Sequence, residues 1–369
     1  MNIDFLKVCS DVTKTARKIP QSQYLSSGQY PIFDQGQKTI SGYYNDAGNI
    51  ANDFPYIVFG DHTRVLKYVN EPCYIGADGV KLLKIINNDF VPKYVFYALL
   101  ANPVNSQGYS RHFKFLKEKK IKIASKKEQH FIIEKLDSIK KSIELKENEL
   151  KSLDELVKSR FIEMFGDIVC NDKSWTTEII TKVCPIKQYD GKITECDGKF
   201  WLLNLDLVES NTGTVLDKYY VAKNEIGNST ITFSENNVLY SKLRPYLNKV
   251  IIPDGNGYAT SELVPFYPLS QVNKYYLAYA LRSDSFVTLI NSKANGAKMP
   301  RAPMDFIRSF PLPLPPIELQ NKFAAFVEQV DKSKFVVHSK YFLWEFLTLF
   351  SSTMAYSSVV SILAWPNIF

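Results

Sequence analysis

Few residues in this sequence combine the types and the spacing that catalysis requires. Asp190-Gly-Lys192 and Asp197-Gly-Lys199 resemble carboxylate-lysine elements of nucleases, but an Asp-Gly pair is foremost a turn signal. Neither a phosphate-binding G-x-x-x-x-G-K-[ST] loop nor a dinucleotide-binding G-x-G-x-x-G motif occurs. The sequence therefore predicts no catalytic centre, cofactor or metal, and it favours binding over catalysis. The histidines have no metal-ligand spacing, and we expect surface or loop positions for all of them: His62, His112, His130 and His338.

Composition and charge narrow the class of protein. Apolar residues make up 45% of the 369 residues, which excludes wholesale disorder, and 14% are aromatic, mainly Phe and Tyr. The net charge of +7 and pI of about 8.9 favour a polyanionic partner, although an ordinary basic protein has the same balance. The five cysteines form no CxxC pair, and the first residues contain an early acid and no apolar core. We therefore expect a cytoplasmic protein with reduced thiols.

The chain contains two copies of one pattern, a variable β-rich block followed by a long helix. The copies are clearest where each block meets its helix, because one constant offset aligns Gln129 with Gln320. A duplicated unit predicts a pseudo-two-fold repeat with two similar surfaces. The same offset aligns the apolar positions that follow, which are Ile132, Leu136 and Ile139 in the first copy and Phe323, Val327 and Val330 in the second.

The blocks also repeat, although loops of unequal length make the offset drift. Each block carries a strand, a basic turn and a returning strand, followed by a short helix-like run rich in Tyr, Phe, Ala and Leu. Such drift is typical of loops that carry specificity on a constant scaffold. We align Lys7-Val-Cys9 with Lys182-Val-Cys184, Ile57 to Val69 with Val238 to Val250, and Lys93-Tyr94 and Leu100 with Lys274-Tyr275 and Leu281.

Residues 126–165 carry the strongest local signal, which is a coiled-coil seam. Apolar residues recur at alternating spacings of four and three, and the residues between them are mostly charged or Ser. Ser125 and Glu128 predict a capping box at the helix start, and Gly166 predicts the helix end. At about 1.5 Å per residue this helix spans roughly 60 Å. The seam positions are Ile132, Leu136, Ile139, Ile143, Lys146, Leu150, Leu153, Val157, Arg160 and Met164.

The second copy continues in the same phase through Lys334, Val337, Tyr341 and Trp344. Two seams of matching phase most simply bury each other, and a pseudo-two-fold axis makes such a pair antiparallel. The alternative is that each helix packs on its own block or on another chain. Residues 346–369 contain no charge but several Ser and Thr, so we interpret them as divergent sequence rather than a membrane span.

These features together predict an α+β protein. It has two β-rich globular domains, separated by two long helices that form an antiparallel coiled coil in a pseudo-two-fold repeat. The first block covers residues 1–124 and its helix covers 125–167. The second block covers residues 168–314, and the second helix with its uncharged tail covers 315–369.

The chain resembles the specificity (S) subunit of type I restriction-modification systems over almost its whole length. The resemblance implies that each block is a target-recognition domain reading one half of a bipartite double-stranded DNA sequence. It also implies that the helices dock methyltransferase (M) subunits and, through the complex, restriction (R) subunits. The segments that carry the resemblance are Tyr30-Pro-Ile-Phe-Asp-Gln-Gly-Gln37 with Gly42-Tyr43, Gly60-Asp-His-Thr-Arg64, Tyr240-Ser-Lys-Leu-Arg-Pro-Tyr246, Gly296-Ala-Lys-Met-Pro-Arg301 and Leu312-Pro-Leu-Pro-Pro-Ile-Glu-Leu-Gln320.

Basic and amide side chains on the predicted loops are the candidate DNA contacts. Arg and Lys bind phosphates or guanine, and Gln can pair with adenine. The alternative is that these side chains are solvated loop charges, or for Arg244 a structural contact within the turn. The candidates are Gln35, Gln37, Lys38, His62, Arg64, Lys67, Arg111 and Lys114 in the first block, and Lys187, Lys242, Arg244, Lys249, Lys298 and Arg301 in the second.

Three other functions stay open at this point. The uncharged tail departs from the family pattern, which motivates a truncated or orphan S subunit that is inactive and competes with an intact one. A DNA-modifying enzyme with unfamiliar motifs is an alternative of another class. The third is a coiled-coil scaffold that binds only protein.

Overall fold

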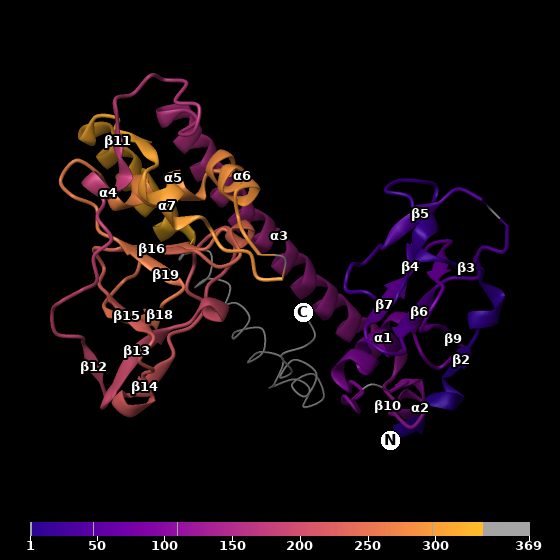
Figure 1. The fold of residues 1–369 in the computed structure, drawn as a ribbon. Coiled ribbons are helices and arrows are strands. Elements are labelled where there is room, and N and C mark those ends of the chain that lie inside the picture. Colours follow the sequence, from indigo (N-terminus) through magenta and orange to yellow (C-terminus); the bar gives the residue numbers. More distant parts are fainter. Residues whose placement is uncertain (1, 47, 109, 297, 335–369) are drawn as a thin grey trace. The chain divides into compact units, whose positions relative to one another are not determined.

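The computed structural model describes residues 2–46, 48–108, 110–296 and 298–334, which form two compact units (Figure 1). Unit 1 extends to Leu145, and unit 2 begins at Lys146 and continues to the end of the described chain. One continuous helix, α3 (Lys126–Phe165), passes from the first unit into the second. Each unit contains both helices and sheets, as the sequence predicts. The predicted seam positions beyond Lys334, His338 and the uncharged tail lie outside the described residues.

Unit 1 is built from small sheets that α1 and the start of α3 cover. One sheet pairs β1 with β10, and the others have the strand orders β2-β9-β6-β7 and β3-β8-β4-β5. The main core joins Ile57 and Leu83 of the second sheet to Leu99 of α1 and Leu136 of α3. The elements are β1 (Asn2–Asp4), β2 (Cys9–Asp11), β3 (Lys18–Ile19), β4 (Tyr30–Phe33), β5 (Gly42–Tyr44), β6 (Tyr56–Gly60), β7 (Leu66–Val69), β8 (Tyr74–Gly76), β9 (Val80–Ile85), α1 (Pro92–Ala101), α2 (Phe113–Leu116) and β10 (Lys120–Lys122).

Unit 2 has a related plan. β11 pairs with β20, one sheet has the order β17-β16-β19, and another has the order β12-β13-β18-β15 with β14 also on β13. Residues 317–334 form the described part of the second long helix. The other elements are β11 (Thr177–Ile179), α4 (Ile180–Val183), β12 (Glu195–Cys196), β13 (Lys199–Leu203), β14 (Tyr220–Ala222), β15 (Thr230–Phe233), β16 (Val238–Ser241), β17 (Val250–Ile251), β18 (Gly257–Thr260), β19 (Leu263–Phe266), α5 (Lys274–Arg282), α6 (Asp284–Ser292), α7 (Met304–Arg308) and β20 (Pro311–Pro313).

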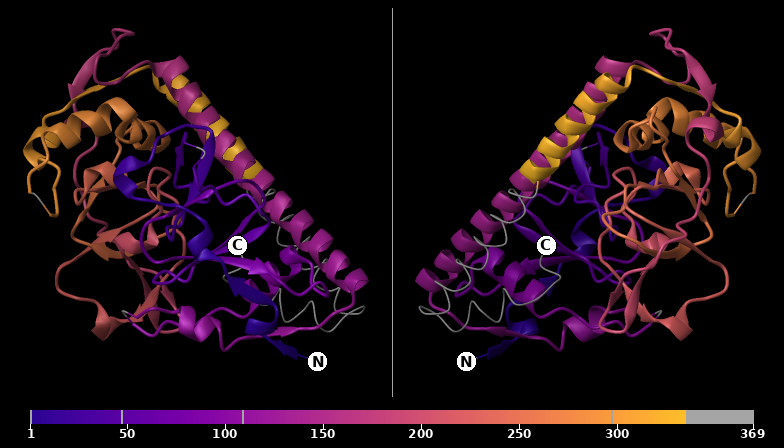
Figure 2. Two further views of the ribbon diagram at one scale, coloured as in Figure 1. Left: turned by 90° about the vertical axis from the view of Figure 1, so that its right-hand side faces the viewer. Right: turned by 90° about the vertical axis from the view of Figure 1, so that its left-hand side faces the viewer.

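The two long helices pack against each other in antiparallel fashion within unit 2, which confirms the predicted pairing (Figure 2). The ring centroids of Phe323, early in the second helix, and Phe165, at the end of α3, are 5.4 Å apart. Lys334 Nζ, later in the second helix, lies 2.5 Å from Oδ1 of Asp154, earlier in α3. Within unit 2 the facing sides of the helices bury apolar surface against each other, so the hydrophobic effect stabilises the pair. The seam positions Ile132 and Leu136 instead pack into the core of unit 1, as the alternative prediction had it for each helix and its own block.

The predicted seam is wrong by one residue at the end of α3. Arg160 is exposed and pairs with Glu163, whereas Phe161 and Phe165 are only 2% and 1% exposed and pack around Phe323. Burying a phenylalanine side chain stabilises by about 1.5–3 kcal/mol, whereas burying an unpaired guanidinium is unfavourable. The helix therefore turns its aromatic residues inward, and their spacing of four replaces the heptad spacing there.

Local capping signals define both ends of α3 as predicted. The Ser125 N–H donates to Glu128 Oε2 at 2.7 Å, and the Glu128 N–H donates back to Ser125 Oγ at 3.3 Å, which is a capping box. Gly166 follows the last helical residue with a φ of +74°, in the left-handed region that glycine adopts at little cost. The predicted start and end of the helix are therefore confirmed.

A buried glutamine joins each unit to the long helix that follows it. Gln129 is fully buried; its Oε1 accepts the Val91 N–H at 2.7 Å, and its Nε2 donates to the Asp89 and Ala124 carbonyls. One side-chain amide thus provides hydrogen-bond partners for backbone groups in the loop before α1 and in the turn before α3. Gln320 is also fully buried and makes the same three bonds in unit 2, to the Asn273 N–H and to the carbonyls of Gln271 and Pro315.

The first segments of the units correspond as aligned, but the short helices are displaced by one residue. β1 pairs with β10 as β11 pairs with β20, both antiparallel. Tyr94 is equivalent to Tyr276 rather than to Tyr275, because each donates its hydroxyl to a carbonyl of the strand before the long helix. The acceptors are Lys122, at 3.0 Å, and Pro313, at 2.7 Å. The segment from β16 to α5 is therefore one residue longer than the corresponding segment from β6 to α1, whereas the predicted alignment gives them equal lengths.

Candidate nucleic-acid interface

The loops at one end of unit 1 bring several candidate DNA contacts together. Gln35 Oε1 accepts the His62 N–H at 3.3 Å, and the Gln35 carbonyl accepts Thr63 Oγ1 at 2.6 Å. Arg64 Nη1 donates to the Val104 carbonyl at 3.3 Å. The loop after β4, the turn between β6 and β7 and the loop after α1 therefore lie side by side. Gln37 and Lys38 are exposed in the first of these loops.

His112 anchors α2 to the same turn. Its ring Nδ1 lies 3.0 Å from the Asp61 carbonyl, and its N–H donates to that carbonyl at 2.8 Å. It is only 1% exposed but lies in the loop before α2, so the expectation of a surface or loop position is met by the loop. The Phe113 N–H donates to Asp61 Oδ1 at 2.7 Å. Arg111 and Lys114, which are both exposed, are thereby held at this end of unit 1.

Lys67 does not belong to the exposed surface, in contrast to the expectation. It is 6% exposed, and its Nζ lies 3.5 Å from Asp34 Oδ1. Burial lowers the pKa of the Lys67 ammonium group, although the charge of Asp34 opposes this. Successive side chains of a strand point to opposite faces, so Lys67 shares the inner face of β7 with the buried Val69. Asp34 directly precedes Gln35, so the ion pair holds the start of the loop that carries Gln35.

Unit 1 is expected to lose stability in acid through Asp34. Burial raises the pKa of this carboxyl, but hydrogen bonds from Ser41 and Gly36 and the charge of Lys67 outweigh burial and place the pKa below its ordinary value. Such a carboxyl stabilises the fold above its unfolded pKa of about 3.9, and this stability is lost as the pH falls through the folded pKa. Thermal unfolding of the wild type and Asp34→Asn from pH 7 to pH 3 should show a Tm difference that closes below about pH 4. An unchanged difference throughout would contradict this role.

Unit 2 gathers its candidates around the turn between β16 and β17. The Arg244 N–H donates to the Pro300 carbonyl at 2.7 Å, and the Ala302 N–H donates to the Lys242 carbonyl at 2.8 Å. The segment that precedes α7 therefore runs along the turn. The candidates brought together here are Lys242, Arg244, Lys298 and Arg301.

The basic side chains near this turn differ in whether a neighbouring group already pairs with their charge. Arg301 is neutralised by Glu262, with Nη2 at 2.8 Å and Nε at 3.2 Å from Oε1. Lys249 Nζ donates to the Leu205 carbonyl at 2.6 Å, and burial lowers the pKa of this ammonium group. Arg244 is half-buried, its Nε is buried without a hydrogen-bond partner, and no described residue pairs with its guanidinium. The guanidinium of Arg244 therefore carries a charge that no described residue neutralises.

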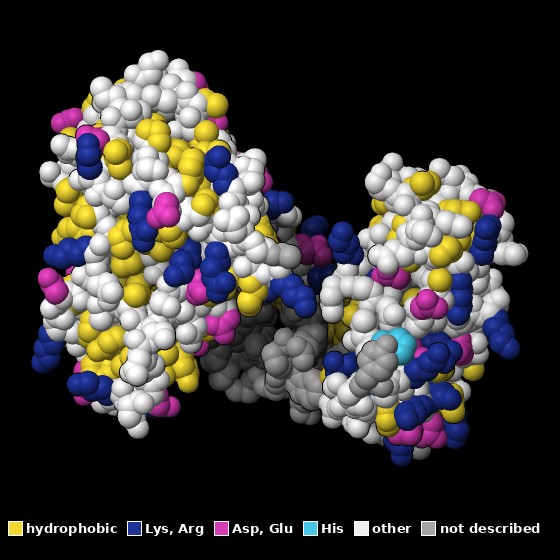
Figure 3. Space-filling view, viewed as in Figure 1, with side chains coloured by type: hydrophobic (Ala, Val, Ile, Leu, Met, Phe, Trp, Pro, Cys, Tyr) yellow, Lys and Arg dark blue, Asp and Glu magenta, His cyan; other side chains and the backbone are white. Residues whose placement is uncertain are grey.

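Lys187 is not brought together with the other candidates of unit 2. It follows Ile186, which bridges to Phe266 beside Val238 at the start of β16, whereas the turn lies at the end of that strand. Its Nζ lies 3.5 Å from Asp190 Oδ2 on the exposed surface. Lys and Arg side chains are interspersed with Asp and Glu on the face that Figure 3 draws. Charge alone therefore marks no interface there, and the loops define the candidate surface.

Each turn contains an arginine with a left-handed backbone. The φ angle is +65° at Arg64 and +49° at Arg244. The other described non-glycine residues with positive φ are Asn or Asp, apart from Ser174. For a residue with a long side chain this conformation costs roughly 1–2 kcal/mol. Residues held in such conformations occur preferentially at functional sites.

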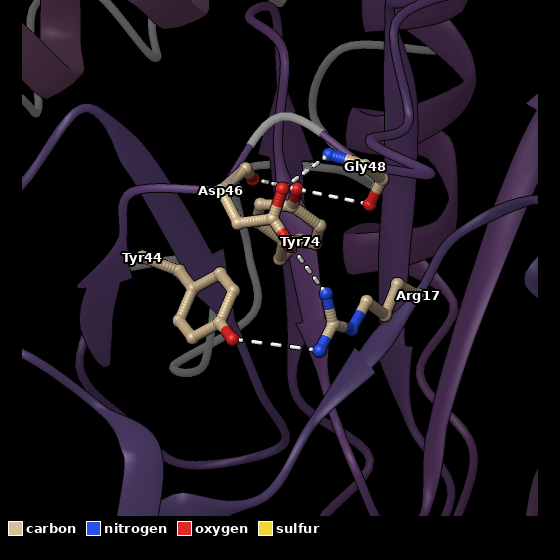
Figure 4. A network of polar contacts seen from close by, with 5 residues as sticks. All are labelled: Arg17, Tyr44, Asp46, Gly48 and Tyr74. Atoms are coloured by element: carbon tan, nitrogen blue, oxygen red, sulfur yellow. Dashed lines mark hydrogen bonds and ion pairs between the residues drawn. The ribbon is translucent and has the colours of Figure 1, made fainter.

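A second polar network lies in unit 1, in the loop that follows β5 (Figure 4). Arg17 Nη1 donates to Asp46 Oδ2 at 2.7 Å, and Arg17 Nη2 lies 3.4 Å from the Tyr44 hydroxyl. The buried Tyr74 hydroxyl donates to the carbonyls of Asp46 and Gly48. Hydrogen bonds from the Gly48 N–H and from Arg17 lower the pKa of Asp46. These groups satisfy one another, so the network holds the loop in place.

The described residues contain no cluster of His, Cys, Asp and Glu suited to a metal ion. Asp197 and Gly198 have φ angles of +50° and +74° and form the turn between β12 and β13, which confirms the turn predicted there. Within the described ranges, no helix has both the length and the apolar character needed to cross a bilayer.

Two units that repeat one scaffold, each followed by a long helix, define a duplicated α+β protein. The family described as "Type I restriction modification DNA specificity domain" matches residues 4–155 and 207–340. These matches cover most of the chain, and the chain belongs to this family. The resemblance inferred from the sequence is confirmed.

Two known proteins illustrate the likeness. The type I restriction enzyme EcoDI specificity subunit of Escherichia coli is 24% identical over 123 residues, which are 33% of this chain and 27% of that protein. The chain thus spans about a quarter of the length of this curated relative. The crystal structure of the type I restriction-modification system S subunit from M. genitalium has a TM-score of 0.55 and 15% identity, covering 100% of this chain and 96% of that one. This second likeness shows the fold.

Proposed function

We propose that this chain recognises a bipartite DNA target as the specificity subunit of a type I restriction-modification complex. The observation that carries the proposal is the duplication. Each unit is bonded to its helix through an equivalent buried glutamine, Gln129 or Gln320, while the surface loops of the two units differ. Equal scaffolds with unequal loops suit two different half-sites. The proposed target-recognition domains are residues 1–124 and 168–314, and the proposed spacer helices are residues 125–167 and 315–369.

The proposed DNA contacts are the loop side chains at the two turns and their neighbours. Phosphate contacts give affinity and orientation, and contacts to base edges give specificity. Lys67 supports its loop from inside and is left out of the contact set. Lys187 is a peripheral member because it lies near the start of β16, away from the turn. Lys249 is peripheral because its ammonium group is bonded to the Leu205 carbonyl. Arg301 is also peripheral, because Glu262 neutralises its charge. The central members are Gln35, Gln37, Lys38, His62, Arg64, Arg111 and Lys114 in unit 1, and Lys242, Arg244 and Lys298 in unit 2.

The proposed protein partners are methyltransferase subunits that dock on α3, and restriction subunits that join through them. Leu145 and Leu156 are 59% and 49% exposed and lie about three turns apart, so they share one face of the helix. Ile162 is 60% exposed on the same helix. Large apolar side chains on an exposed helix favour contact with another protein.

The test is a methylation map of the host genome with and without this chain, in the presence of its methyltransferase subunits. We expect a methylated motif with two defined halves and an undefined spacer, which disappears when the gene is deleted and returns with the gene. Co-purification with the methyltransferase subunits is the parallel measurement. A complex that forms but methylates no motif would support a competing, inactive subunit instead, and methylation by the purified chain alone would establish an enzyme.

A further inference from the structure

We propose that Arg64 and Arg244 bind the DNA phosphate backbone, one at each half-site, and that the loops that differ between the units read the bases. This inference rests on the proposed function and assigns phosphate binding and base reading to different residues of that interface.

The two turns are anchored by the same pair of backbone bonds. In unit 1 the Asp61 N–H donates to the Gly79 carbonyl at 2.6 Å, and the Asp61 carbonyl accepts the His112 N–H at 2.8 Å. The turn is thereby fixed to the start of β9 and to the segment that leads into α2. The corresponding groups in unit 2 are Lys242, Glu262 and Ala302, with distances of 3.0 and 2.8 Å.

Soon after its anchor, each turn presents an arginine in the left-handed conformation. Arg64 is exposed, and the one hydrogen bond described for its guanidinium, to the Val104 carbonyl, is long at 3.3 Å. Arg244 is half-buried, and its guanidinium has no described hydrogen-bond partner. Neither guanidinium pairs with a described carboxylate, so neither charge is neutralised within its unit. A planar guanidinium with free N–H groups is well suited to bind phosphate in bidentate fashion.

The repeat decides between phosphate binding and base reading. Two half-sites of different sequence share the phosphodiester backbone and do not share their bases. An arginine that occurs in both turns, close after the equivalent residues Asp61 and Lys242, matches the shared feature. The surroundings of the two arginines differ. In unit 1 the loop with Gln35, Gln37 and Lys38 flanks Arg64. In unit 2 the segment that carries Lys298 runs along the turn of Arg244, and the equivalent segment of unit 1 carries Arg111 instead. These unequal loops are therefore the base readers.

The test uses Arg64→Gly and Arg244→Gly in the complex with the methyltransferase subunits. Glycine adopts the left-handed conformation freely, so each variant keeps its turn and its Tm while losing the guanidinium. Binding is measured over a salt series with two duplexes, one with the mapped motif and one without it. Loss of one phosphate contact should lower the slope of log K against log salt by about 0.9, which is roughly eightfold weaker binding at 0.1 M salt for both duplexes. The methylated motif should not change.

The matched control is Arg308→Gln, which removes an exposed arginine that pairs with Asp305 and whose carbonyl lies beside α4. Its affinity and salt slope should equal those of the wild type. A glycine variant whose motif changed at one base would show that the arginine reads sequence, and unchanged affinity and slope would show that it only shapes the turn. Either result overturns the inference. A wild-type complex that bound neither duplex and methylated no motif would instead refute the proposed function.

Discussion

Insertion of one heptad into α3 is expected to change the spacer between the two halves of the methylated motif, or to abolish methylation, with both half-site sequences unchanged. The helix is continuous from Lys126 to Phe165, so seven added residues lengthen it by about 10 Å. That length corresponds to about three base pairs at roughly 3.4 Å each. A heptad also nearly preserves the rotational phase of the helix, so the seams on either side of the insertion keep their partners.

The insertion belongs between Ile139 and Leu153, where α3 has no fully buried side chain. Ile139 is the last buried residue of the helix on the side of unit 1, and Val157 is the first on the side of unit 2. The control replaces residues 140–146 with another helical heptad of equal length, which should leave the spacer unchanged. An inserted heptad that left the same spacer would rule out α3 as the element that sets the distance between half-sites.

Replacement of Gln320 by leucine is expected to lower the free energy of unfolding of unit 2 by about 2–5 kcal/mol. The substitution removes three hydrogen bonds and leaves the Asn273 N–H and two carbonyls unpaired beside a buried apolar side chain. Each unsatisfied buried group costs about 1–3 kcal/mol, and partial access to water reduces the total. The same change at Gln129 should destabilise unit 1 by a similar amount, because the three bonds are the same.

Urea unfolding gives the size of the loss, and native-state hydrogen exchange shows which unit carries it. Gln329→Leu is the matched control, since Gln329 is exposed on the same helix as Gln320 and should change stability by less than about 0.5 kcal/mol. A loss below about 1 kcal/mol in both buried variants would mean that the glutamines do not hold the helices to their units.

Several features of the site could not be predicted because they depend on distant parts of the chain. His112 is buried where its ring contacts the carbonyl of Asp61, which is 51 residues away in the chain, and no local sequence pattern predicts that contact. Tyr94 and Tyr276 are equivalent because of the carbonyls they reach, which a drifting alignment cannot reveal. Lys67 is different, since the alternation along β7 offered a signal: it shares a face with Val69.

The sequence by itself determined the duplication, the α+β class, both ends of α3, the antiparallel helix pair and the family. These follow from periodicity and from caps such as Ser125 with Glu128, which act over a few residues and are therefore legible along the chain. Only the tertiary structure decided which charges are free. Lys67 is buried against Asp34, Arg301 is neutralised by Glu262, and the guanidinium of Arg244 has no described partner. The physical reason is that the availability of a charge depends on burial and on partners brought close by folding, and neither is encoded in the spacing of residues along the chain.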